Sequence, residues 1–402
     1  MTLSTSGISL RRVQAAWWGT VVLFLVHGLI VSTWISRIPA VKAALGLSDA
    51  VLGLDLLSIA AGAVCMIPIA GWLIGRFGSK KVSIVASTAF CCSLVLPSLA
   101  VNAAGLAAGL LVFGAAAAAM DVSMNAQGVE VEKGFGAPTM SRFHGMFSLG
   151  GMAGAGMGGL VARRGIAPIP HFAISAGINL TAVLLIARFL LDTHEHGEPG
   201  GHRLPLNKIP RVLLALSAIG FCVLLAEGAM ADWTALYLKQ ILNADAGTAA
   251  AGYAVFSAAM ALFRFLGDLI TARLGPMRTV RTGSLVAGLG LMWALCVHAP
   301  GWSMPGFAAA GAGFSVIIPL VFGSGGRVEA IKPGAGIATV TGIGYLGFIV
   351  GPPVIGFASQ LFTLRYALGV VVACCLLTML LSGYMRELKP VRVSETVPEL
   401  HL

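Results

Sequence analysis

The sequence repeats itself at a fixed offset of 197 residues. The segment 71–81 returns as the segment 268–278, and Gly114 returns as Gly311, with no gap needed between these matches. Both copies lie within long apolar stretches, so the repeat predicts two related bundles of membrane helices. A duplicated helical bundle is typical of transporters, because alternating access works by rocking one repeat against the other around a central site.

The composition independently predicts a membrane protein. Apolar residues make up 57% of the chain and charged residues 10%, against about 25% charged residues in soluble domains. The apolar runs are long and continuous, which favours helices over a β-barrel. We therefore predict an all-α membrane protein of two six-helix repeats, with twelve spans at roughly 15–36, 51–74, 82–100, 104–127, 143–162, 168–190, 211–238, 247–270, 279–299, 303–326, 337–359 and 364–385.

The distribution of Lys and Arg predicts the orientation of these spans. With both termini in the cytoplasm, the cytoplasmic segments hold 19 of the 26 basic residues, the external loops hold 6, and Arg264 lies inside a span. The net charge of +10 is thus mostly a signal of topology. Because the basic residues are scattered over loops and form no basic helix face, we expect no nucleic-acid partner.

The longest polar stretch of the chain lies between spans six and seven and predicts a linker between the two halves. It carries three histidines, which could bind a metal ion, but nothing in the sequence fixes their positions. We therefore predict a solvated linker, and no metal site or cofactor. The predicted segments are an N-terminal half at 1–191, a cytoplasmic linker at 192–210, a C-terminal half at 211–386 and a cytoplasmic tail at 387–402.

The segment 71–81 resembles the G-x-x-x-D-R-x-G-R-R loop between spans two and three of the major facilitator superfamily. Gly71, Arg76 and Gly78 fit that pattern, whereas Gly75 stands where the pattern has Asp. In the second copy, Arg273 occupies the position of the arginine. This resemblance implies a twelve-helix fold and secondary transport. The sequence contains no Walker phosphate loop, so we do not expect this chain to drive transport with ATP.

Within the superfamily, the chain looks like the MosC/YbjJ branch of bacterial inner-membrane proteins. The similar stretches are 32–39, 144–150, 226–233 and 344–353. A more distant resemblance is to the fucose permeases, which carry an acid followed four positions later by Asn in span four, as do Asp121 and Asn125 here; their carboxylate late in span one has no counterpart at 34–36. The branch implies transport in the bacterial inner membrane without fixing a substrate.

Two carboxylates are the candidates for proton coupling. Glu227 lies about 16 residues into span seven, roughly 24 Å from its start, with no charged residue within four positions along the helix. Ionisable groups in a bilayer are costly and mostly functional, although Glu227 could also bond a neighbouring helix as structural glue. Asp121 and Asn125 share one face of span four and predict a polar face toward substrate, or else a clamp between helices.

Four further side chains are candidates for substrate contact. His27 and His144 lie on spans one and five, and either could instead be a packing residue. Trp34 and Tyr345 could stack on a sugar ring, or could belong to an interfacial aromatic belt.

Gating and structural roles are predicted for a third group of residues. Arg264 precedes Asp268 by four positions and predicts an intrahelical ion pair, and Asp55 is placed to pair with Lys42 or Arg37. The run from Gly347 to Pro353 predicts a bend in span eleven. The candidates in this group are Gly71, Arg76, Gly78, Arg264, Asp268, Arg273, Gly347, Gly351 and Pro352.

These observations predict a secondary transporter rather than an enzyme. We expect it to move a small polar organic solute, sugar-like or polyol-like, coupled to protons, and to work as a monomer in the lipid bilayer. One alternative is a proton-antiporting exporter of amphipathic compounds. Another, of a different class, is a membrane sensor that transports nothing.

Overall fold

The computed structural model describes residues 9–136, 139–192, 209–328, 331 and 333–387. Within these residues, twelve helical segments are long and apolar enough to cross a membrane, which confirms the predicted all-α architecture. The helices are α1 (Leu10–Leu45), α2 (Asp49–Phe77), α3 (Ser79–Ser93), α4 (Leu96–Leu99), α5 (Ala103–Phe135), α6 (Met140–Arg163), α7 (Pro168–Ile186), α8 (Arg211–Gln240), α9 (Ala246–Phe265), α10 (Gly267–Leu274), α11 (Pro276–Cys296), α12 (Pro300–Phe314), α13 (Ile317–Gly325), α14 (Pro333–Leu361), α15 (Leu364–Ala367) and α16 (Gly369–Leu381).

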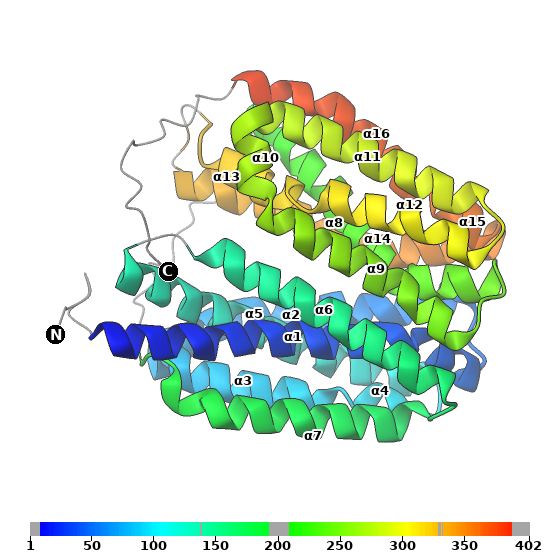
Figure 1. The fold of residues 1–402 in the computed structure, drawn as a ribbon, viewed down its shortest axis with the longest axis horizontal. Coiled ribbons are helices and arrows are strands. Elements are labelled where there is room, and N and C mark those ends of the chain that lie inside the picture. The colour runs from blue at the N-terminus through cyan, green and yellow to red at the C-terminus, as the bar shows by residue number, and fades with distance from the viewer. Residues whose placement is uncertain (1–8, 137–138, 193–208, 329–330, 332, 388–402) are drawn as a thin grey trace.

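Helices α1–α7 form one group, here called the N-terminal half, and α8–α16 form a second group, the C-terminal half (Figure 1). Turns that contain glycines with positive φ mark the two ends of the bundle. Gly46 and Gly165 lie at one end, called the Gly46 end, while Gly78, Gly136 and Gly275 lie at the other, called the Gly78 end. Figure 1 shows the two halves close together at the Gly46 end and diverging toward the Gly78 end, where α1 begins.

The sequence repeat has a matching repeat of packing contacts. A Cβ atom at Gly114 would collide with the carbonyl of Ile59 across the α2–α5 interface, and one at Gly311 would collide with the carbonyl of Phe256 across the α9–α12 interface. Both glycines and both partners are separated by the same offset. Small residues let membrane helices approach closely without a side chain between them, so the repeated glycines specify the same helix pair in each half.

The loop signature also recurs in its backbone conformation. Gly78 has φ 84° and ψ 150°, and Gly275 has φ 76° and ψ 159°. These positive φ values are accessible to glycine and strained for other residues. Arg76 stacks on the rings of Trp72 and Phe77 in its own helix, 5.7 and 5.6 Å from their centres.

The remaining members of the loop signature make few contacts. A Cβ atom at Gly71 would meet nothing within 4 Å, and Arg273 is exposed. The glycine of the turn is therefore the member of the signature that the backbone requires. Among the described residues, neither Gly71 nor Arg273 makes a contact that joins the two halves.

Helices α2 and α14 join the two halves near the Gly46 end. The Asp49 carboxylate forms an ion pair with Lys42 at 2.6 Å and accepts hydrogen bonds from Ser359 and Gln240 of the C-terminal half. A Cβ atom at Gly53 would lie 2.7 Å from the carbonyl oxygen of Pro352. The predicted pairing of Asp55 with Lys42 or Arg37 is wrong, because Lys42 is engaged by Asp49 and Arg37 donates to the carbonyl of Ile166.

Helix α14 is assigned as one helix with both prolines inside it, and the predicted bend of span eleven stays a prediction. Gly347 packs against the backbone of α8, where a Cβ atom would collide with the carbonyl of Phe221, whereas a Cβ atom at Gly351 would lie 3.4 Å from Cγ of Leu225. The carbonyl of Pro352 and the backbone at Gly356 approach α2 instead. Gly347 and Gly351 therefore pack within the C-terminal half, whereas Pro352 and Gly356 meet the other half.

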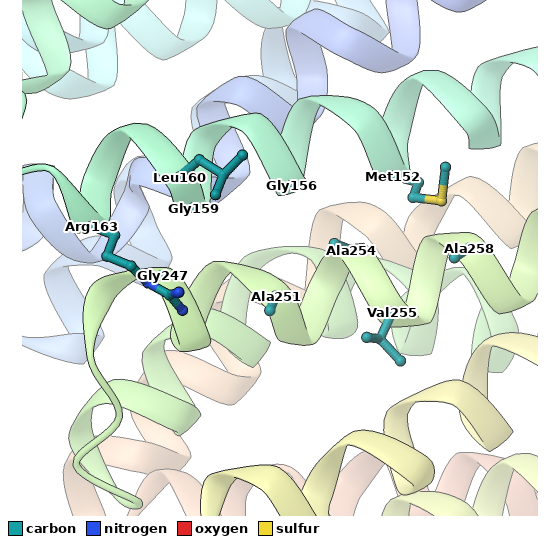
Figure 2. A pocket seen from close by; sticks show the side chains of 10 residues that line it. All are labelled: Met152, Gly156, Gly159, Leu160, Arg163, Gly247, Ala251, Ala254, Val255 and Ala258. Atoms are coloured by element: carbon teal, nitrogen blue, oxygen red, sulfur yellow. The ribbon is translucent and has the colours of Figure 1, made fainter.

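The second seam between the halves runs along α6 and α9. Gly159 approaches Gly247, and Gly151 lies beside Ser257. Figure 2 shows a pocket of about 320 Å³ on this seam, lined mainly by glycine, alanine and other apolar side chains of the two helices. At the Gly46 end of the seam, Arg163 lies 3.6 Å from Asp245. Small side chains thus bring the two halves together along a continuous line.

The halves as domains, with boundaries at 191 and 210, stay a prediction. Residues 193–208, which hold the three histidines of the predicted linker, lie outside the described residues, as does the tail from 388 onward.

Candidate functional site

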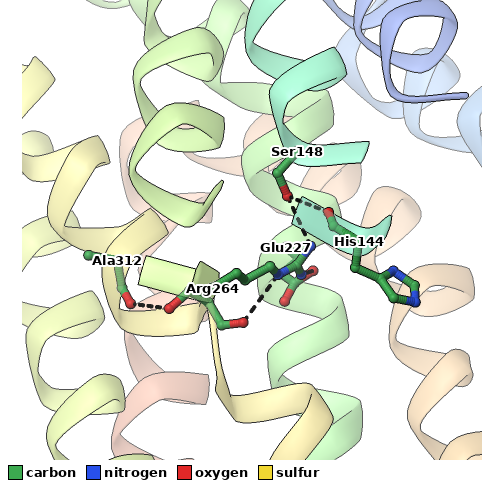
Figure 3. Close-up of polar contacts among 6 residues, drawn as sticks. His144, Ser148, Glu227, Arg264 and Ala312 are labelled. Carbon is green, nitrogen blue, oxygen red and sulfur yellow. Dashed lines mark hydrogen bonds and ion pairs between the residues drawn. The ribbon is translucent and has the colours of Figure 1, made fainter. Parts of the chain in front are cut away.

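An arginine near the end of α9 connects the two halves through its polar contacts (Figure 3). The Arg264 guanidinium on α9 lies 3.9 Å from the Glu227 carboxylate on α8, measured between Nη2 and Oε2. Its Nη1 donates to the Ser148 hydroxyl on α6 at 3.1 Å, and its Nε donates to the carbonyl of Ser315 at 3.2 Å. We call Glu227, Arg264, Ser148 and Ser315 the central cluster.

The carbonyl of Ser315 is available to Arg264 because of a proline. In a continuous helix this carbonyl would accept from the N–H four residues later, but that residue is Pro319, which has no N–H. The span is interrupted at the same place, since α12 ends at Phe314 and α13 begins at Ile317. The guanidinium therefore fills a hydrogen-bonding position that the sequence leaves empty.

Glu227 is held asymmetrically in this cluster. Its side chain and that of Arg264 are each 15% exposed. One carboxylate oxygen faces Arg264, whereas Oε1 is buried with no hydrogen-bond partner among the described residues. A buried oxygen without a donor is costly while the group is charged. The arrangement thus suits a carboxyl group that can hold a proton.

The predicted pairing of Arg264 with Asp268 stays a prediction, and the structure adds a pairing of Arg264 with Glu227 on the neighbouring helix. Helix α9 ends at Phe265 and Asp268 lies in α10, so the two residues do not share one continuous helix. The side chain of Asp268 lies outside the described part of the structure. Glu227 has no charged residue within four positions along its own helix, but it is not isolated from charge, because Arg264 of the neighbouring helix lies 3.9 Å from it.

His144 joins the cluster through its backbone. The Ser148 hydroxyl donates to the carbonyl of His144 at 3.3 Å while it accepts from Arg264. The imidazole of His144 lies edge-on to the ring of Phe24, with 5.2 Å between ring centres, and within electrostatic range of Arg264. The N-terminal half thus presents the Ser148 hydroxyl to the guanidinium of the C-terminal half, while the His144 ring points away from Arg264 (Figure 3).

Asp121 and Asn125 share one face of α5, as their spacing implies. The Asn125 amide donates to the Asp121 carbonyl at 2.8 Å and to its carboxylate at 3.2 Å. Tyr345 on α14 is 40% exposed, and its hydroxyl lies within electrostatic range of both Asp121 and Glu227. A tyrosine of the C-terminal half thus lies near one carboxylate from each half.

His27 and Trp34 lie within aromatic packing of the N-terminal half. The ring of His27 is 5.0 Å from Phe90 and 5.4 Å from Phe147, and the side chain is 8% exposed. Trp34 is 1% exposed and packs near Phe113 and Phe172. Neither side chain is presented to a ligand in this conformation.

The described residues contain no cluster of three or more His, Cys, Asp or Glu side chains that could hold a metal ion. All seven cysteines fall in the described part and are free thiols.

Ser148 and Ser315 were not among the predicted site residues. A serine on an apolar helix carries no distinctive signal, because its hydroxyl normally bonds its own helix backbone. Pro319 was the available clue for Ser315, since it marks an unpaired carbonyl four residues earlier.

Comparisons with known proteins agree on the family. The family model described as the Major Facilitator Superfamily matches residues 15–327. An uncharacterized MFS-type transporter of Yersinia pestis is 38% identical over 361 residues, covering 90% of this chain and 93% of the relative. The membrane protein MosC of Rhizobium meliloti is 32% identical over 362 residues, covering 87% of each.

Solved structures show the same fold at low identity. The nucleoside transporter NupG aligns with a TM-score of 0.70 at 14% identity, covering 92% of this chain and 98% of its own. A bacterial homolog of the human lysosomal transporter Spinster aligns at 0.69 and 15% identity, covering 94% and 97%. FucP in its outward conformation aligns at 0.62 and 15% identity, covering 91% and 98%.

The repeated bundle, the interface between the halves and the sequence relatives lead to one assignment. The protein is a multi-pass membrane transporter and not an enzyme. The resemblance to the MosC branch that the sequence motifs indicated is confirmed. The chain belongs to the major facilitator superfamily.

Proposed function

We propose that this transporter moves a small polar organic solute across the bacterial inner membrane, coupled to protons, with Glu227 as the group that loads and releases the proton. The observation that carries this proposal is the position of Glu227. It is mostly buried in the bundle, faces one cation, and has a second oxygen with no hydrogen-bond donor among the described residues. Such a group can exchange a proton when its surroundings change.

Protonation of Glu227 would be transmitted to the other half through Arg264. The same guanidinium that faces Glu227 also donates to Ser148 on α6. When the carboxyl is neutral, Arg264 loses the attraction of the Glu227 charge, and the balance of its contacts moves toward Ser148 and Ser315. A change of charge in the C-terminal half therefore alters a contact that crosses the seam, which is how a ligand or proton shifts a two-state equilibrium.

Asp121, Asn125 and Tyr345 are the proposed solute contacts. They offer a carboxylate, an amide and a phenol, which match the hydroxyl groups of sugars, polyols and nucleosides. Two solved structures of this fold are, by their titles, a nucleoside transporter and a fucose:proton symporter. These names guide the choice of test compounds.

The topology is part of the proposal. With both termini in the cytoplasm, the Gly46 end lies outside, so the contacts of Asp49 with the C-terminal half close the external side of the described conformation. Both halves belong to one chain, and we propose that a monomer completes the cycle.

The proposal can be tested with purified protein in two steps. A thermal-stability screen over sugars, polyols and nucleosides should identify a ligand, because binding to the folded state raises the melting temperature. Uptake of that ligand into proteoliposomes under an imposed proton gradient should then be compared between the unmodified protein and Glu227→Gln. Glu130→Gln is a matched control, since Glu130 pairs with Lys133 outside the central cluster.

Glu227→Gln should abolish uphill accumulation while it preserves ligand binding and exchange. Asp121→Asn should weaken ligand binding instead. Unchanged accumulation and unchanged pH dependence in Glu227→Gln would refute the assignment of proton coupling to Glu227, and unchanged ligand binding in Asp121→Asn would refute its role as a solute contact. Outward transport driven by inward proton flow would indicate an exporter, and the absence of flux with every stabilising ligand would favour a sensor.

A further inference from the structure

A second pocket lies between the two halves at the Gly46 end, away from the central cluster. It has a volume of about 270 Å³. Its N-terminal wall comes from the end of α1 and the turn after α6, and its C-terminal wall comes from Lys239 on α8 and from Ala246 and Ala249 on α9. Of the residues that line it, Arg37 and Lys239 carry charge, and both charges are positive. The pocket therefore has an unbalanced positive character.

Arg37 is buried without a full set of hydrogen-bond partners. Its side chain is 3% exposed, and one nitrogen of its guanidinium donates to the carbonyl of Ile166. The Nε and Nη1 atoms are buried with no partner among the described residues. Buried donors of a charged group are normally satisfied, and a guanidinium presents its donors in a planar fork that fits carboxylate and phosphate oxygens.

The nearby charges do not neutralise this arginine. Asp49 is engaged by Lys42, and Asp245 lies beside Arg163 and accepts from the backbone of its own helix. His171 on α7 is a titratable neighbour of Arg37 among the described residues, and this group brings no negative charge.

We propose that this pocket binds a small anion with a carboxylate or phosphate group between Arg37 and Lys239. The anion would complete the hydrogen bonding of the buried guanidinium and would contact a cation from each half. A ligand that bridges the halves here favours the conformation in which the Gly46 end is closed, because it binds that state better than one with the halves apart. The site regulates or slows the transport cycle, independently of the role proposed for Glu227.

The anion has two possible sources, a free anion in solution or the phosphate of an acidic lipid headgroup. The first arm of the test measures the melting temperature of lipid-free protein in a neutral detergent as inorganic phosphate is added. Sodium chloride at the same ionic strength is the reference. The second arm compares nanodiscs of phosphatidylcholine alone with nanodiscs that also contain phosphatidylglycerol, both without free phosphate. We expect stabilisation in at least one arm, and the arm that responds identifies the source.

Four variants separate binding from general stability. Lys239→Gln removes an exposed charge of the pocket and should weaken the apparent affinity about fivefold. Arg37→Gln should weaken it by about tenfold or more, because a charge-assisted hydrogen bond is lost. Ala43→Phe keeps both cations and fills the pocket from an exposed position on its wall, so it should abolish the response even if Arg37→Gln does not fold. Arg164→Gln is the matched control, because it removes an exposed cation near the pocket that does not line it.

The expected pattern is a response in the unmodified protein and in Arg164→Gln, a reduced response in Lys239→Gln, and none in Ala43→Phe. Stabilisation in neither arm would overturn the proposal. A response that persists unchanged in Ala43→Phe, or that Arg164→Gln reduces as much as Lys239→Gln does, would also overturn it.

Discussion

Replacing Glu227 with glutamine should destabilise the protein as well as uncouple it, and the size of the loss can be worked from the structure. The substitution keeps the shape of the side chain and removes its charge. Arg264 then remains 15% exposed, with hydrogen bonds to Ser148 and Ser315 but without the one anion that pairs with it among the described side chains. A mostly buried cation without an anion is the costly state that this variant creates.

The raw attraction between the two charges sets an upper limit. At 3.9 Å and an effective dielectric constant of about 20, Coulomb's law gives about 4 kcal/mol. Solvent reaches part of both side chains, and the pair already carries a desolvation cost. Exposed pairs contribute up to about 1 kcal/mol, so we expect a coupling free energy of about 2 kcal/mol for this partly buried pair.

The assay is a double-mutant cycle with Glu227→Gln, Arg264→Gln and the combined variant. The free energy of unfolding of each protein is measured in mixed detergent micelles. Arg264→Gln should cost more than Glu227→Gln, because it also removes the donors to Ser148 and to the Ser315 carbonyl. The combined variant should be more stable than the sum of the single losses predicts, since the second substitution removes the uncompensated charge.

A coupling free energy below about 0.5 kcal/mol, the usual scatter of additive sites, would refute this reasoning. It would mean that solvent screens the pair in the folded protein, and the proposed transmission of charge from Glu227 to Ser148 would lose its basis. Glu130→Gln serves as a control for the assay. Its partner Lys133 is exposed, so we expect only a small loss in the free energy of unfolding.

Three further predictions address packing, a buried hydrogen-bond network and topology. Gly347→Leu should impair folding and lower the yield of stable protein, because its side chain would collide with the backbone of α8. Gly351→Leu should insert normally and slow uptake in the proteoliposome assay. Equal yields of stable protein for both variants would contradict this prediction. Gln127→Leu should lower the free energy of unfolding by about 2–3 kcal/mol, because Gln127 is fully buried and its amide bonds Ser79 and the backbone of Leu191; a loss below 1 kcal/mol would show that these groups find other partners. In a cysteine-free background, Arg164→Cys should react with an impermeant thiol reagent in intact cells and Gly200→Cys should not, and the reverse labelling would overturn the orientation.

Local sequence signals predicted the architecture well. Hydropathy alone identifies spans, because the bilayer forces each apolar run of about 20 residues into a helix whose backbone is satisfied internally. The 197-residue offset predicted that both halves would pack alike, and the paired contacts of Gly114 and Gly311 show that they do. The shared face of Asp121 and Asn125 also followed from spacing, since residues four apart are neighbours on a helix.

The partners of the polar groups were decided by the tertiary structure. Spacing along one helix suggested Asp268 as a partner for Arg264, but it could not reveal Glu227, which the packing of α8 against α9 brings within 3.9 Å of the guanidinium. The carbonyl of Ser315, left without its helical donor by Pro319, accepts a further hydrogen bond from Arg264. The sequence predicted that Trp34 would stack on a sugar ring or lie in an interfacial aromatic belt, yet packing within the N-terminal half buries its side chain. Hydropathy and periodicity describe one helix at a time, whereas contacts between helices depend on how those helices are rotated and how closely they approach. The sequence by itself therefore determined twelve helices in two similar sets, and only their packing decided which charges meet at the centre.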